Sequence, residues 1–321
     1  MPRGVRRRAW SLPSAIVATL IALAGLLAAG CTPAGRSTPM AEDPRRPTIT
    51  VTSFDFTESQ VLAELYAQAM RAKGYPVEIV PALGPREIVQ PALEQGRVDF
   101  VVGYLGSGVN FLYEQRRVAT ADVTATFAKF ARALADRGIT ALAFAPAEDR
   151  NGFVVTGDLA RRRGLRQISD LRPIARQLTL GGPSECPNRV LCLRGLHEVY
   201  GLRFKAFEPT PSRAMTANAL EAGEIQVGMI ETTDGNLADH DLVQLADDRH
   251  LQPPENVVPI MRSAMVKAYG PALVRLVNAV TARLTTDDLI VLNGQVDRNE
   301  ASPQAAAAAW LREHPVDGQR G

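Results

Sequence analysis

The sequence predicts an α/β protein built as two open-sheet lobes, with a ligand cleft between them and two crossover segments joining them. Short β-branched or apolar runs alternate with longer segments of helical period from about residue 48 to 315. Polar, proline-containing breaks interrupt this alternation at 146–151 and 247–254. Only one further strand is expected after the second break, and a single strand cannot form a third sheet. The chain is therefore expected to return and complete the first lobe.

The first lobe begins with the strand 48–52 and a helix that opens at Thr57 with the capping-box form T-x-x-Q. Gly74 ends that helix, and Gly84-Pro85 opens another. The run 98–102 is apolar except for Asp99, which is typical of a parallel strand covered on both faces. The other elements expected here are strands at 77–80 and 141–144 and a helix over 122–137.

The second lobe shows the same alternation, and the first lobe then resumes. Strands are expected at 153–156, 178–180, 204–207, 225–230 and 242–245, with a helix over 212–222; after the second break come a strand at 257–261 and helices at 271–284, 286–292 and 303–311. The predicted boundaries are 48–146 plus 252–321 for lobe I and 147–251 for lobe II. Because strand ends and helix starts of both lobes converge on such a cleft, we expect the ligand there.

The N-terminus has the pattern of an export signal. Four arginines precede the apolar run 15–30, which is shorter than the roughly 20 residues of a spanning helix. Ala28-Ala29-Gly30-Cys31 resembles the bacterial lipobox, although Ala28 stands where Leu is more usual. We therefore predict a lipoprotein signal peptide over 1–30, a diacylglycerol on Cys31 that anchors the protein outside the cytoplasm, and a flexible tether over 31–47. A plain signal peptide with an incidental cysteine is the alternative.

Charge and motifs exclude several classes of function. Removal of residues 1–30 takes away four arginines and no acid, so the formal charge changes from +2 to −2. Nucleic-acid binding is therefore not expected, because it needs a cationic surface. The sequence has no G-x-S-x-G, H-E-x-x-H or P-loop motif, and its four histidines lack metal-ligand spacing. An exported α/β enzyme without a recognisable motif, or an exported sensor domain, remains as an alternative to a binding protein.

Two cysteines lie six positions apart in the folded part, at Cys186 and Cys192. In an oxidising compartment a disulfide is the leading interpretation, and it would fix the shape of this loop. A metal site that also uses His197 is the sharper alternative, although no fourth ligand is near in sequence. A cysteine nucleophile is a further, weaker possibility.

Several segments resemble the quaternary-amine substrate-binding proteins of ABC importers, the class that binds glycine betaine, choline, carnitine and proline betaine. The resemblance covers essentially the whole folded chain in order, in segments 52–70, 74–78, 83–93, 147–156, 164–171, 180–189, 232–237 and 284–297. It implies a type II periplasmic-binding-protein fold, a monomer without cofactor or catalysis, and a permease with its ATPase as partners.

The resemblance also implies an aromatic cage, since a trimethylammonium group donates no conventional hydrogen bond and is held by ring faces. Tyr104 matches the family's cage tyrosine and follows an apolar strand. Phe56 lies in the F-T-E segment, and Phe153 leads the first strand of the second lobe. For both phenylalanines core packing is the alternative.

A zwitterionic ligand needs a partner for its carboxylate, and Arg86 at a helix start is the candidate. A surface charge or an inter-lobe salt bridge is its alternative role. Backbone N–H groups at helix starts near Thr57 and Thr232 are expected to assist. Asn151, just before Phe153, completes the expected ligand set.

Two positions depart from the family pattern. Gly103 stands where the family usually has an acid, and Glu231 stands where it usually has an aromatic ring. We expect Glu231 to attract an ammonium group directly, which favours a cationic ligand such as choline. Glu255 is expected to lie on the surface of the hinge.

Overall fold

The computed structural model describes residues 46–235, 237 and 240–316. The predicted signal peptide, Cys31 and nearly all of the tether lie outside these residues and stay predictions. Within the described ranges, none of the helices combines the length and the apolar character needed to cross a membrane.

The first sheet has five strands in the order β2-β1-β3-β10-β4. They are β1 (Ile49–Val51), β2 (Val77–Ile79), β3 (Phe100–Tyr104), β4 (Ile139–Ala141) and β10 (Val257–Arg262). β1 runs parallel to β2 and β3, whereas β10 is antiparallel to both β3 and β4. The returning strand β10 therefore inserts between strands of the N-terminal part of the chain.

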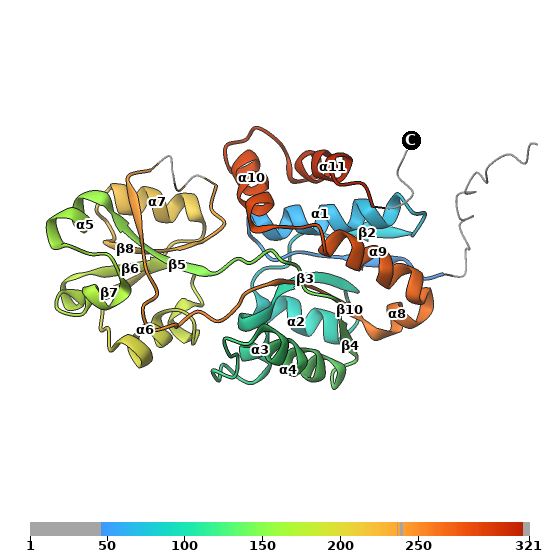
Figure 1. The fold of residues 1–321 in the computed structure, drawn as a ribbon, viewed down its shortest axis with the longest axis horizontal. Helices are drawn as coiled ribbons and strands as arrows, with labels where there is room; N and C mark the ends of the chain where they lie inside the picture. The colour runs from blue at the N-terminus through green and yellow to red at the C-terminus, as the bar shows by residue number, and fades with distance from the viewer. Residues whose placement is uncertain (1–45, 236, 238–239, 317–321) are drawn as a thin grey trace, which may run out of the picture. The chain divides into compact units, whose positions relative to one another are not determined.

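Helices cover both faces of this sheet (Figure 1). One face carries α1 (Thr57–Arg71), α9 (Pro271–Thr281), α10 (Thr286–Asp297) and α11 (Pro303–Glu313); the other carries α2 (Arg86–Glu94), α3 (Leu105–Leu112) and α4 (Val123–Ala135); α8 (Ser263–Tyr269) follows β10. Tyr66 of α1 is fully buried, and its hydroxyl lies 2.9 Å from Oγ1 of Thr281. One hydrophobic core therefore joins the N-terminal and C-terminal parts of this lobe.

The second sheet also has five strands, in the order β7-β6-β8-β5-β9. The strands are β5 (Asn151–Thr156), β6 (Thr179–Gly182), β7 (Ala206–Pro209), β8 (Val227–Glu231) and β9 (Leu242–Leu245). The α-helices of this lobe are α5 (Gly157–Arg163), α6 (Leu193–Tyr200) and α7 (Arg213–Glu221). Short 3-10 helices lie at η1 (Ile168–Leu171), η2 (Ala175–Gln177) and η3 (Cys186–Asn188). β5 is antiparallel to β8 and β9. Alternation along β5 places Val154 in the core with α7, and Phe153 and Val155 in the core with α6.

Two crossover segments connect the sheets, and they hydrogen-bond to each other. The N–H of Asp149 donates to the carbonyl of Glu255 over 3.1 Å, and the N–H of Val257 donates to that of Ala147 over 3.0 Å. The first segment continues into β5 and the second into β10. The α/β prediction with two sheets and two crossovers is confirmed, whereas the exact lobe boundaries stay a prediction.

Candidate functional site

A cavity of about 240 Å³ is lined by residues from both lobes and from the crossovers. The first lobe contributes the loop after β1, the start of α2 and the junction of β3 with α3. The second lobe contributes the loops around β6 and β7 and the end of β8. Its lining includes Phe54, Phe56, Arg86, Tyr104, Ser107, Asp149, Asn151, Arg213, Glu231 and Glu255.

Aromatic rings form the wall of the first lobe. The rings of Phe54 and Phe56 are stacked with centroids 5.9 Å apart and planes inclined by 5°, and Tyr104 lies 6.0 Å from Phe56. Phe56 and Tyr104, the two predicted cage residues of the first lobe, are therefore neighbours in the cavity lining. Phe54 was missed, although it stands two positions before Phe56 in the same loop and its ring carries the guanidinium of Arg86 at 5.1 Å.

Glu58 supports the ring of Tyr104 from behind. The carboxylate is fully buried and accepts hydrogen bonds from the Tyr104 hydroxyl at 2.6 Å, the Thr233 hydroxyl at 2.6 Å and Nδ2 of Asn293 at 2.7 Å. Burial and the charge of Glu58 raise the pKa of Tyr104 well above its usual value, so the phenol stays protonated and donates. Sequence reasoning quoted the F-T-E segment but gave Glu58 no role.

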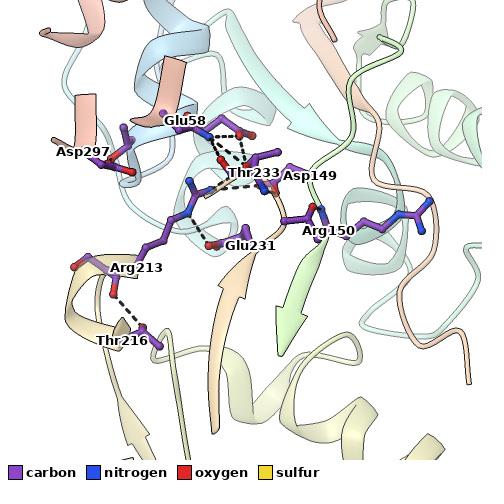
Figure 2. Close-up of polar contacts among 12 residues, drawn as sticks. Glu58, Asp149, Arg150, Arg213, Thr216, Glu231, Thr233 and Asp297 are labelled. Carbon is purple, nitrogen blue, oxygen red and sulfur yellow. Dashed lines mark hydrogen bonds and ion pairs between the residues drawn. The ribbon is translucent and has the colours of Figure 1, made fainter. Parts of the chain in front are cut away.

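Arg213 of α7 lies among carboxylates at the second-lobe side of the cavity. Figure 2 shows it reaching between Glu231 and Asp149: Nε donates to Oε2 of Glu231 at 2.8 Å, and Nη2 lies 3.5 Å from Oδ2 of Asp149. Burial alone would lower the pKa of Arg213, but the carboxylates of Glu231, Asp149 and Glu58 raise it, so it stays charged. Burial and the charge of Glu58 raise the pKa of Asp149 well above its usual range. Glu231 is therefore paired, and the bare charge expected of it is offset by Arg213.

Arg86 and Glu255 form a second buried polar group. Nη2 of Arg86 donates to Oγ of Ser107 at 3.0 Å, while the N–H of Ser107 donates to Oε1 of Glu255 at 2.6 Å. Burial raises the pKa of Glu255 to about 7 although Arg86 opposes the shift. Burial and the charge of Arg189 lower the pKa of Arg86 to about 10. Glu255 is only 3% exposed and lines the cavity, so its expected place on the hinge surface is wrong.

The remaining predicted ligand residues divide into one at the cavity and three away from it. Asn151 lines the cavity, with Nδ2 donating to the carbonyl of Leu191 at 3.0 Å. Phe153 is 1% exposed and lies in the second-lobe core, so it has the core-packing role that was the alternative to ligand binding. Thr57 donates to Oδ1 of Asp297 at 2.6 Å, and Thr232 accepts from the N–H of Arg150 at 2.9 Å. Neither threonine is part of the lining, although α1 begins at Thr57.

Comparison with known proteins matches residues 47–313 to the family described as the substrate binding domain of the ABC-type glycine betaine transport system. The chain belongs to this family. A glycine-betaine-binding protein of Pseudomonas aeruginosa is 27% identical over 316 residues, covering 94% of this chain and 96% of the relative. The carnitine transport binding protein OpuCC of Listeria monocytogenes is 23% identical, covering 83% of this chain and 87% of the relative.

Solved structures agree on the fold. A crystal structure of a glycine betaine/carnitine/choline ABC transporter superimposes with a TM-score of 0.65 at 22% identity, covering 83% of this chain and 98% of that chain. The type II binding-protein fold and the family resemblance are thus confirmed. The chain is accordingly an extracytoplasmic solute-binding protein of an ABC transporter.

The disulfide loop forms one rim of the cavity in this family member. Cys186 and Cys192 are joined by a disulfide with Cα atoms 5.2 Å apart, so the metal alternative loses both thiolates. Among the described residues, no group of three or more His, Cys, Asp or Glu side chains is arranged to hold a metal ion. Arg189 of this loop forms an ion pair with Glu87 of α2 at 3.0 Å. The rim therefore contacts the opposite lobe directly.

Proposed function

We propose that the protein captures a small quaternary amine of the glycine betaine or choline class in this cavity and delivers it to an ABC permease with its ATPase. The observation that carries the proposal is the aromatic wall of Phe54, Phe56 and Tyr104. A methylated ammonium group is attracted by ring faces, at about 0.5–2 kcal/mol per well-placed ring. The family membership supports the same ligand class.

Within that class we propose a zwitterion rather than a cation. The ammonium group would face the aromatic wall of the first lobe, and the carboxylate would face Arg213 of the second. Nη1 of Arg213 is buried and has no acceptor among the described residues, so the guanidinium retains capacity for a further oxygen. Arg86 already donates to Ser107 beside Glu255. We therefore propose Arg213, in place of Arg86, as the partner of the ligand carboxylate. The preference for a cationic ligand expected from Glu231 is not retained, because Arg213 neutralises that carboxylate.

The same proposal includes the setting of the protein. Cys31 would carry the lipid that holds it to the membrane, and the tether would let one monomer reach the permease. We propose no catalytic activity. Closure of the lobes is driven by the ligand only if the closed form binds it more tightly, and a site built from both lobes has this property.

The test is isothermal titration of the purified mature chain with glycine betaine and with choline. Glycine betaine should bind more tightly, and Phe56→Ala should weaken its binding by about 2- to 30-fold, the loss of one ring contact. Glu64→Gln is the matched control, because Glu64 lies on α1 and pairs with Gln68 away from the cavity. No heat with either amine, or equal affinity in wild type and Phe56→Ala, would contradict the proposal.

A further inference from the structure

We propose that Glu58 is a positioning residue that couples closure of the lobes to the placement of Tyr104, and that Thr233 of the second lobe completes it. The inference rests on the proposed function, because Tyr104 must contact the bound amine for its placement to matter. Glu58 and Thr233 are each fully buried and neither lines the cavity. Their effect on the ligand must therefore be transmitted through the residues that they hold.

The donors around Glu58 come from both lobes. Tyr104 at the end of β3 and Asn293 of α10 belong to the first lobe, whereas Thr233 follows β8 of the second lobe. All three groups donate to the two oxygens of this side chain, which act only as acceptors in these contacts. A buried carboxylate needs such donors, and charge-assisted hydrogen bonds are among the strong ones.

The turn that carries Thr233 is seated on α10 by backbone contact. A Cβ on Gly235 would lie 2.5 Å from Cα of Gly294, so the backbones of the turn and of α10 approach more closely than a side chain at Gly235 would allow. Nδ2 of Asn293 also donates to the carbonyl of Thr233 at 3.0 Å. The Thr233 hydroxyl thus reaches Glu58 only while this turn of the second lobe rests against the first.

Separation of the lobes would remove one of the three donors from a carboxylate that has no contact with solvent. The closed form is therefore stabilised by Thr233, and in that form Glu58 is held by both lobes. The Tyr104 hydroxyl donates to the same carboxylate. The hydrogen bond between Thr233 and Glu58, which forms on closure, therefore also helps to fix the ring of Tyr104 at the cavity wall. Loss of this contact should shorten the lifetime of the bound state rather than slow the first encounter.

Stopped-flow kinetics with glycine betaine tests this inference on the full mature chain. Thr233→Val removes the hydroxyl and should raise the dissociation rate by about 10- to 100-fold, the effect of losing a hydrogen bond to a charged group. The association rate should stay within about threefold. Thr233→Ser keeps the hydroxyl and should restore the wild-type rate.

A double-mutant cycle separates coupling from general damage. Glu58→Gln should also raise the dissociation rate, and Glu58→Gln with Thr233→Val should be markedly less than additive, since both changes remove the same contact. Additive effects, or a Thr233→Val dissociation rate equal to wild type, would overturn the inference and leave the proposed function standing. A wild-type protein that fails to bind the amine would overturn both.

Discussion

Glu255 should make the unliganded protein lose stability as the pH rises. Burial raises the pKa of this carboxyl from 4.5 to about 7 in the folded state, and the unfolded chain keeps the ordinary value. Between these two values the folded state binds more protons than the unfolded state, so the free energy of unfolding falls as pH increases. At about 1.4 kcal/mol for each pH unit between the two pKa values, the loss is about 3 kcal/mol, complete above pH ~7 and absent below pH ~4.5.

Urea unfolding of the unliganded chain at about pH 4.5 and pH 7.5 measures this directly. Glu255→Gln carries no ionisable group there, so its free energy of unfolding should fall by about 3 kcal/mol less than that of wild type across the same interval. Asp149, whose pKa is also raised, contributes to both proteins and cancels in the difference. Glu78→Gln, at an exposed carboxylate of β2, is the control for the loss of one carboxyl group. Identical pH dependence in wild type and Glu255→Gln would refute the reasoning.

Three further predictions concern the core, the rim and the hinge. Phe153→Ala should lower the free energy of unfolding by about 3–5 kcal/mol in urea titrations, while the folded variant should bind glycine betaine with nearly unchanged affinity. A variant with wild-type stability and lost affinity would instead show that Phe153 contacts the ligand. Reduction of the Cys186–Cys192 bridge should lower the free energy of unfolding by about 2 kcal/mol, and an unchanged urea midpoint would contradict its stabilising role. Gly106→Ala should destabilise the closed hinge, because the new Cβ would lie 2.8 Å from the carbonyl oxygen of Pro254; wild-type melting and affinity would count against this packing.

The fold was predictable because buried strands carry a continuous apolar signal. β3 and β8 are covered on both faces, and each begins two residues after its predicted start. β4 begins two residues before its predicted start and β7 two residues after it, whereas the edge strands β2 and β9 begin where predicted. Helix α3 was missed because Gly106 and Gly108 lower helix propensity. In the structure both glycines lie under close contacts, with Pro253 and Phe130, that a side chain would obstruct.

The site was predictable only in the part that a single loop or strand end carries. Phe56 and Tyr104 come from motifs whose place in the fold follows from the resemblance. Arg213 and Glu58 gain their roles from partners that lie on other elements, and no local pattern marks such pairs. Phe153 was assigned to the site because it leads the first strand of the second lobe, and only the register, which places it between Met229 and Leu245, shows that it lies in the core.

The most direct test of the account compares glycine betaine with 3,3-dimethylbutanoate, in which carbon replaces the charged nitrogen and the shape is kept. If the aromatic wall recognises a methylated cation, titration calorimetry should give glycine betaine at least about tenfold higher affinity. Equal affinity for the two compounds would contradict the central claim that the rings of this cavity select a quaternary amine.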